Sequence, residues 1–189
     1  MMQRPQPRDV IVIGTGGMGA AAACHLARRG ARVLGLDRFP VAHDRGSSHG
    51  QTRLIRLAYY EHPDYVPLLR RAYALWHDLE RETGRPLLVE SGLVMAGPAT
   101  GAVVAGALAS AHAHRLPVER LTAAAAMARW PALRVPEAWD VVYEPTAGYL
   151  HVEDCVRAHA AAAKHAGAAL RDGVTVRGWR IAGGRVEVE

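Results

Sequence analysis

The segment from Asp9 to Asp37 constrains the fold more than any other part of this chain. It opens with the short apolar run 10–13, whose valines and isoleucines are typical of a buried parallel strand. Glycines in the pattern G-x-G-x-x-G follow at 14, 16 and 19, where that strand should turn into a helix. A helix over 20–29, a stop at Gly30 and a second strand over 31–36 complete the predicted βαβ unit.

Each residue of this pattern has a mechanical reason. Gly14 permits the tight turn, Gly16 lets the backbone approach a pyrophosphate, and Gly19 lets the helix pack against the strand. The N–H groups and the positive dipole end of the helix then face the phosphates. Asp37 follows the second strand, where a carboxylate can accept hydrogen bonds from a ribose diol. The pattern therefore predicts a dinucleotide site rather than a glycine-rich turn without a ligand. Arg38 can accommodate a 2′-phosphate, so this segment alone leaves NADP open.

Composition and charge exclude several other classes. The chain has 189 residues, of which 50% are hydrophobic and 22% charged, as in ordinary globular proteins. The net charge of +5 raises the question of nucleic-acid binding. The arginines are scattered singly or in pairs, however, which argues against a nucleic-acid partner. Cys24 and Cys155 form no C-x-x-C pair, and the apolar runs are too short to span a membrane. We therefore expect a soluble, cytoplasmic protein without a membrane partner.

The ten histidines do not predict a metal site. His112 and His114 are the only close pair, and residues two apart do not share a helical face.

The rest of the chain alternates between helical and strand-like patterns. The segment 51–59 has helical character, and Arg53 and Arg56 would then share one face. Further helices are predicted over 64–82, 101–114, 122–128 and 152–166, with strands over 87–89, 92–95, 118–121, 139–143, 168–170 and 174–176, and a hairpin at 183–184.

This order predicts an α/β fold in which a Rossmann-like nucleotide-binding domain is interrupted by a mixed α/β substrate domain. The expected parts are the first section of the nucleotide domain over 1–84, a partial substrate domain over 85–146, and the resumed nucleotide domain over 147–189. Because the chain ends on a hairpin strand, we expect it to be the N-terminal portion of a larger protein, incomplete at its C-terminus. A self-sufficient single domain is the alternative.

Three blocks of sequence resemble a known family. They are DVIVIGTGGMG with LGLD at 9–37, GSSHGQTRLIRLAY at 46–59 followed by Glu61, and YEPTAGYLHVEDC at 143–155. Together they resemble the monomeric sarcosine oxidase and N-methyltryptophan oxidase group of the D-amino-acid-oxidase-like FAD-dependent oxidoreductases. The middle block is the specific one, since it is not a general nucleotide motif. The resemblance runs over nearly the whole chain but covers only the N-terminal half of such enzymes.

The resemblance implies FAD as the cofactor rather than NAD(P). It places the glycine pattern at the pyrophosphate, Asp37 at the adenosine ribose, the polar loop along the flavin and the backbone of Val176 at the adenine. The residues that we expect to bind the cofactor are Gly14, Gly16, Gly19, Asp37, Arg38, Ser47, His49, Thr52 and Val176.

The same resemblance implies a substrate site. Arg56 matches the arginine that binds the substrate carboxylate, and a planar guanidinium is suited to a bidentate grip on that group. Arg53 would lie against the flavin and stabilise negative charge on the reduced ring. Tyr59 and Glu61 match residues bordering the substrate cavity. Solvated or salt-bridged arginines are the alternative interpretation of Arg53 and Arg56.

The expected function is FAD-dependent oxidation of a secondary amine or N-methyl amino acid, with oxygen as acceptor and hydrogen peroxide as product. In the resembling oxidases the C-terminal half supplies a flavin-linking cysteine and a lysine that assists oxygen activation, and neither position exists here. Cys24 and Cys155 lie in the wrong region to replace that cysteine. A non-catalytic FAD-binding fragment, a split-enzyme subunit needing a separate C-terminal chain, and an NAD(P)-dependent dehydrogenase are the alternatives.

Overall fold

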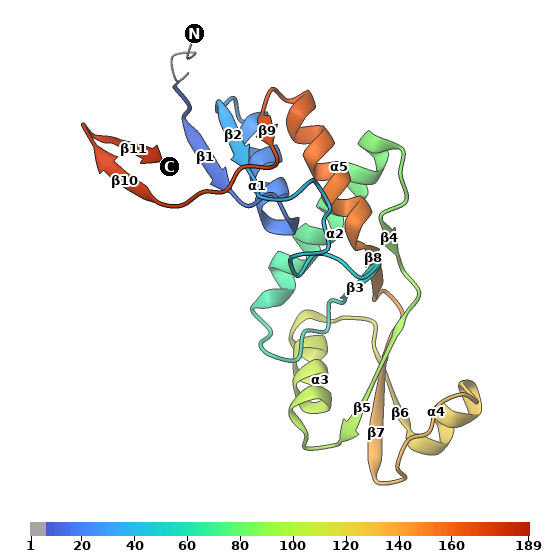
Figure 1. Ribbon diagram of the computed structural model, residues 1–189. Coiled ribbons are helices and arrows are strands. Elements are labelled where there is room, and N and C mark those ends of the chain that lie inside the picture. The colour runs from blue at the N-terminus through green and yellow to red at the C-terminus, as the bar shows by residue number, and fades with distance from the viewer. Residues whose placement is uncertain (1–6) are drawn as a thin grey trace. The chain divides into compact units, whose positions relative to one another are not determined.

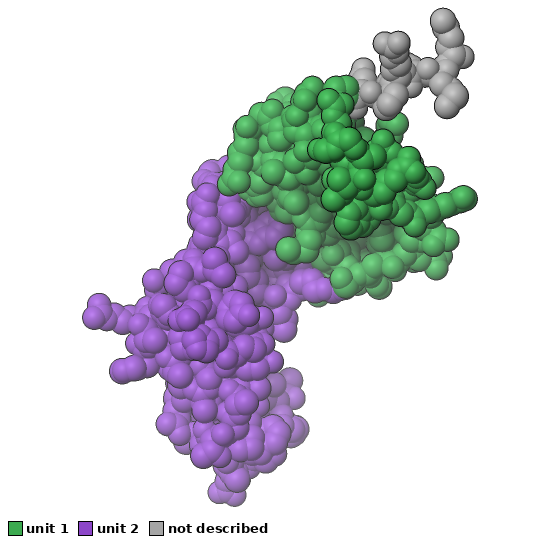
Figure 2. All heavy atoms as spheres, turned by 90° about the vertical axis from the view of Figure 1, so that its left-hand side faces the viewer, with its two compact units in different colours: residues 1–52, 151–189 green, residues 53–150 purple. Residues whose placement is uncertain are grey.

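The computed structural model describes residues 7–189, and the chain divides into two compact units. Residues 1–52 and 151–189 form unit 1, and residues 53–150 form unit 2 (Figure 2). Each unit has its own hydrophobic core. Among the described residues, none of the helices combines the length and the apolar character that crossing a membrane requires.

Unit 1 contains the predicted βαβ start. Strand β1 (Val10–Ile13), helix α1 (Gly17–Arg28) and strand β2 (Val33–Leu36) follow one another, and later come helix α5 (Val152–His165) and strand β9 (Ala169–Arg171). The three strands form a parallel sheet in the order β1-β2-β9. Figure 1 shows α5 alongside α1. The predicted βαβ arrangement is therefore confirmed, and α1 begins three residues earlier than expected.

Small side chains let the two helices of unit 1 pack closely. Ala20 of α1 is fully buried and forms a cluster with Val156 and Ala160 of α5, against which Leu170 of β9 packs. Removing this apolar surface from water is the main favourable contribution to folding. The packing fixes the N-terminal end of α1 beside the carboxyl ends of β1 and β2.

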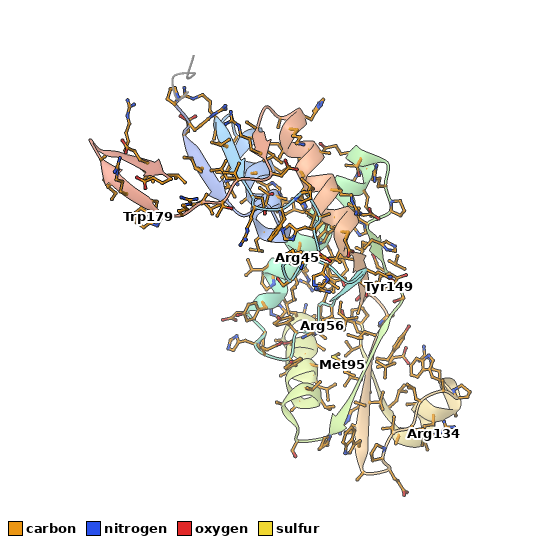
Figure 3. All side chains as sticks on the ribbon, in the orientation of Figure 1. Arg45, Arg56, Met95, Arg134, Tyr149 and Trp179 are labelled. Atoms are coloured by element: carbon orange, nitrogen blue, oxygen red, sulfur yellow. The ribbon has the colours of Figure 1, made fainter. Side chains whose placement is uncertain are left out.

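The last part of unit 1 is a two-stranded hairpin of β10 (Trp179–Ala182) and β11 (Arg185–Val188). Its register pairs Trp179 with Val188 and Ile181 with Val186, so these four apolar side chains share one face. Trp179, labelled in Figure 3, is 65% exposed. The predicted hairpin is confirmed, but the strand expected over 174–176 is not formed. Gly173 has φ +69° and turns the chain after β9, and the segment then continues in extended form, with the Val174 N–H donating to the Asp37 carbonyl.

Unit 2 is a mixed α/β body. Its helices are α2 (Tyr65–Thr83), α3 (Ala102–His114) and α4 (Ala123–Arg129). Its strands are β4 (Leu88–Val89), β5 (Leu93–Pro98), β6 (Glu119–Thr122) and β7 (Trp139–Glu144), together with β3 (Thr52–Ile55) and β8 (Gly148–His151), whose outer residues belong to unit 1. The strands form two small sheets, β3-β8-β4 and the antiparallel β5-β7-β6. The main core lies between α3, the start of α2 and the β5-β7-β6 sheet, and includes Val66, Met95, Val104 and Val142.

The helix expected over 51–59 is wrong. Gly50 and Gln51 both have positive φ, 93° and 69°, which interrupts any helix, and residues 52–55 pair as β3 with β8. Strand β8 was not predicted from the sequence. Residues three apart on extended backbone point to opposite faces, so Arg53 and Arg56 do not share a helical face.

The compact units divide the chain at 52/53 and 150/151, whereas the domains expected from the sequence divide it at 84/85 and 146/147. Helix α2 falls in unit 2 because Val66 belongs to its core and the Tyr73 hydroxyl donates to the Thr146 carbonyl. The functional assignment of the expected domains stays a prediction.

Candidate functional site

A cavity of about 820 Å³ lies in unit 1 at the N-terminal end of α1. Its wall comes from the carboxyl ends of β1 and β2, the first turns of α1, the loop after β2, and the extended segment after β9. The residues that line it are Ile13, Gly14, Gly16, Gly17, Met18, Gly19, Ala22, Leu36, Asp37, Arg38, Phe39, Ala42, His43, Gly46, Ser47, Ser48, Val156, Val174, Thr175 and Val176.

The three glycines of the motif differ in what they permit. Gly14 has φ +87°, which favours glycine. A Cβ at Gly19 would overlap the carbonyl oxygen of Gly14, so only glycine allows α1 to pack this closely on the turn. A Cβ at Gly16 would meet only Ser48 Oγ at 3.9 Å. Gly16 therefore leaves open space beside the first turn of α1, whose N–H groups have no partners within the helix.

Asp37 is held by a set of backbone and side-chain donors. Its Oδ2 accepts from the Thr15 N–H at 2.6 Å and the Thr15 hydroxyl at 3.2 Å, and its Oδ1 accepts from the Phe39 N–H at 2.9 Å. His43 Nε2 lies 3.6 Å from Oδ1. Burial alone would raise the pKa of Asp37, but the hydrogen bonds from Phe39 and Thr15, with His43 nearby, bring it below its ordinary value. An ionised carboxylate offers about four acceptor positions, so at least one remains for a ligand hydroxyl.

The polar loop that follows is fastened at two points. Ser48 Oγ accepts from the Gly17 N–H at 3.1 Å, at the N-terminus of α1. Glu153, in the first turn of α5, accepts from the Gly50 N–H at 2.8 Å and the Gln51 N–H at 3.1 Å. Ser48, Glu153 and Thr15 were not predicted from the sequence as residues of this site. Glu153 acts across about a hundred residues, and no local pattern reveals such a partner.

Most of the predicted cofactor residues come together at this cavity. Gly14, Gly16, Gly19, Asp37, Arg38, Ser47 and Val176 line it. His49 and Thr52 do not line it.

In unit 2 the structure gathers three of the four predicted catalytic residues. Arg56 follows β3 directly (Figure 3), and its side chain is 16% exposed. Its Nη2 lies 3.4 Å from Glu61 Oε2, and its guanidinium carbon lies 4.6 Å from the ring centre of Tyr59 and 5.0 Å from that of Tyr60. Arg56 Nε is buried and has no hydrogen-bond partner among the described residues. Arg53 lies in β3 and is exposed.

The fold and the cavity define a dinucleotide-binding α/β protein. A family profile described as "FAD dependent oxidoreductase" matches residues 9–189. The chain therefore belongs to the family of FAD-dependent oxidoreductases, whose cofactor is FAD.

Comparison with individual proteins shows which members of this family the chain resembles. The chain is 49% identical over 162 residues to the monomeric sarcosine oxidase of Streptomyces avermitilis, covering 86% of this chain and 42% of that protein. It is 39% identical over 182 residues to the monomeric sarcosine oxidase of a Bacillus species, covering 96% and 47%. It is 44% identical over 161 residues to the N-methyl-L-tryptophan oxidase of Salmonella arizonae, covering 85% and 43%. The resemblance seen in the three sequence blocks is confirmed, and the chain spans a little under half the length of these relatives.

Solved structures agree with this placement. NikD, described as an unusual amino acid oxidase essential for nikkomycin biosynthesis, superposes with a TM-score of 0.86 at 29% identity, covering 97% of this chain and 48% of that one. The glycine oxidase of Geobacillus kaustophilus gives 0.71 at 27% identity, covering 92% and 48%.

The cavity fits the phosphate and ribose part of FAD. The open space at Gly16 beside the helix N-terminus suits a pyrophosphate, and the fixed carboxylate of Asp37 suits a ribose diol.

Proposed function

We propose that this chain contributes the FAD site and a carboxylate-binding arginine to an FAD-dependent oxidase of secondary or N-methyl amino acids, with oxygen as the acceptor. The observation that carries the proposal is the state of Arg56. Its guanidinium is mostly buried, it contacts two tyrosine rings, and its Nε–H has no acceptor among the described residues.

A buried cation of this kind is incompletely compensated. Taking a charge out of water is costly, and Glu61 at 3.4 Å together with the two aromatic rings supplies only part of the compensation. The remaining Nε–H points to a further acceptor, because an unsatisfied buried donor costs about 1–3 kcal/mol. A carboxylate that bridges Nε–H and a terminal N–H would satisfy it with bidentate geometry.

The names of the relatives support an N-methyl amino acid as the substrate class. Sarcosine and N-methyl-L-tryptophan are both N-methylated amino acids, and each combines a carboxylate with a secondary amine. Binding of the carboxylate by Arg56 would hold such a substrate in one pose, and the pre-organised pose lowers the entropic cost of reaction.

The residues of unit 1 would hold the cofactor. The first-turn N–H groups of α1 would bind the pyrophosphate, Asp37 would accept from the ribose, and Val176 would border the adenine. FAD, when bound, would supply the acceptor for the hydride equivalent that leaves the C–H bond next to the amine nitrogen as C–N becomes C=N, with oxygen as the final acceptor and hydrogen peroxide as the product. Arg53 would stabilise negative charge on the reduced ring.

The proposal is tested by adding FAD to the purified chain, removing unbound cofactor and recording the visible absorption. Retained flavin that is bleached anaerobically by N-methylglycine, and that yields peroxide with oxygen, would support it. Arg56→Lys keeps the positive charge but removes the planar pair of N–H donors that can bind both oxygens of a carboxylate. Because this bidentate pairing is lost, the variant should need a tenfold or higher N-methylglycine concentration for bleaching. Retained flavin that no N-methyl amino acid reduces would instead favour a non-catalytic FAD-binding protein, or a subunit that needs a separate C-terminal chain.

A further inference from the structure

The segment that carries Arg56 has no regular secondary structure from residue 56 to residue 60. The guanidinium nevertheless needs a fixed backbone to stay against the rings of Tyr59 and Tyr60. The contacts that hold this segment come from two other elements of unit 2.

The first contact is a buried carboxylate at the end of β7. Glu144 is 0% exposed, and its Oε1 and Oε2 accept from the N–H groups of Leu57 at 2.6 Å and Ala58 at 2.9 Å. The Thr146 hydroxyl also donates to Oε1, at 3.3 Å. Burying a carboxylate is costly unless donors surround it, and here the donors are the two residues that directly follow Arg56.

The second contact is helix α3. The Ser110 hydroxyl, which is fully buried, donates to the Tyr59 carbonyl at 2.5 Å. A Cβ at Gly106 would overlap the Tyr60 carbonyl oxygen, so the helix lies directly against that peptide. The backbone is therefore hydrogen-bonded at residues 57 and 58 through N–H groups and at residue 59 through its carbonyl, and at residue 60 it packs directly against α3.

We propose that Glu144 is a positioning residue that presents the Arg56 guanidinium to the substrate carboxylate. The inference rests on the proposed function, in which Arg56 binds that carboxylate. Glu144 does not touch the ligand. Its charge fixes the peptide groups at 57 and 58, and this fixes the direction in which the Arg56 side chain leaves the backbone. Without the Glu144 carboxylate the guanidinium would sample other orientations. Fixing one orientation on binding would then cost entropy, so the substrate carboxylate would bind more weakly.

The test compares Glu144→Gln with Glu80→Gln. Glu80 is a matched control, because its Oε1 also accepts from two successive backbone N–H groups, Leu87 at 2.7 Å and Leu88 at 2.9 Å, at the start of β4. N-methylglycine is titrated into the ¹⁵N-labelled chain, and the Arg56 Nε–H signal, assigned by its loss in Arg56→Lys, reports binding. Hydrogen exchange at the backbone amides is measured in parallel.

In Glu144→Gln the amides of Leu57 and Ala58 should exchange faster, and the dissociation constant for N-methylglycine should rise about tenfold, because hydrogen bonds to a charged group are replaced by one neutral acceptor and one opposed donor. In Glu80→Gln the amides of Leu87 and Leu88 should exchange faster instead, and the dissociation constant for N-methylglycine should stay at the wild-type value. Equal affinities in the two variants would overturn the positioning role while leaving the carboxylate-binding role of Arg56 intact. A wild-type Arg56 signal that ignores N-methylglycine would overturn both.

A second variant keeps the proposal testable if Glu144→Gln does not fold. Ser110→Ala removes the hydroxyl that holds the Tyr59 carbonyl and should weaken N-methylglycine binding about threefold, as loss of one neutral hydrogen bond predicts. Thr83→Ala is its control, because the Thr83 hydroxyl donates to the Leu79 carbonyl at 2.7 Å within α2. Unchanged affinity in both would mean that the hold on this segment does not position Arg56.

Discussion

Gly19 shows how a single missing methyl group determines the turn at the cofactor cavity. A Cβ there would overlap the Gly14 carbonyl oxygen, which is backbone and cannot rotate away. Gly19→Ala should therefore lower the free energy of unfolding by about 1–3 kcal/mol, the usual cost of overpacking. Denaturant unfolding measures the change.

Gly16→Ala is the matched comparison, because its Cβ would meet only Ser48 Oγ at 3.9 Å. It should change stability by less than Gly19→Ala and weaken FAD binding, since the added methyl group takes the space offered to the pyrophosphate. Equal unfolding midpoints for the two variants would contradict this distinction.

Asp37 should make stability depend on pH in the acid range. Its folded pKa lies below the ordinary value because the hydrogen bonds from Phe39 and Thr15 outweigh burial. Because the pKa of Asp37 is lower in the folded protein than in the unfolded chain, its ionised carboxylate stabilises the fold at pH values above the unfolded pKa of about 3.9. This stabilisation is lost as the pH falls through the folded pKa. The unfolding free energy of the wild type should therefore approach that of Asp37→Asn as the pH is lowered from 7 to 3. A constant difference between the two proteins over that range would show that Asp37 contributes nothing through its charge.

At the level of elements, the turn into β3 carries a strained residue. Gln51 has φ +69°, in the left-handed region that costs a non-glycine residue about 1–2 kcal/mol. Gln51→Gly should raise the free energy of unfolding by up to about 1 kcal/mol, because relief of strain exceeds the greater entropy of glycine in the unfolded chain. Gln51→Ala retains the strain and serves as the control in the same thermal unfolding experiment. Equal stabilisation by alanine and glycine would mean that the strain is not the cause.

The same turn explains why one element was predicted wrongly. Local patterns were sufficient for the βαβ start, the amphipathic helix α2 and the hairpin, because periodicity and glycine positions encode them directly. The segment 51–59 reads locally as a helix, yet β3 forms by pairing with β8, a partner about a hundred residues away. Glu153 accepts from the N–H groups of residues 50 and 51, and Glu144 from those of residues 57 and 58, so two carboxylates of the third sequence block hold the middle block in place.

The candidate site, like the fold, was predictable from the sequence where its residues are neighbours in the chain. Arg56, Tyr59 and Glu61 lie close in sequence, and the structure brings them together. Ser110 and Glu144 hold that group through long-range contacts that no spacing rule describes.

For the whole molecule, the two cores predict two separable unfolding events. Val33 is fully buried in unit 1 and Val104 is fully buried in the core of unit 2. Val104→Ala should lower the stability of unit 2 by about 2 kcal/mol, a typical cost for a core truncation, and leave the FAD-stabilised transition unchanged. Val33→Ala should do the reverse. Calorimetry with and without FAD separates the cases, and one common transition shifted by both variants would show that the units unfold together.

The β10–β11 hairpin should influence how readily molecules of this protein associate in solution. Trp179, Ile181 and Val186 are each more than half exposed and lie on one face, while Arg180 and Glu187 form an ion pair on the other. An apolar face on a ribbon with open strand edges favours contact between molecules. Salts such as sulfate strengthen apolar association, so they should lower the solubility limit of the chain, with this hairpin as the first surface to adhere.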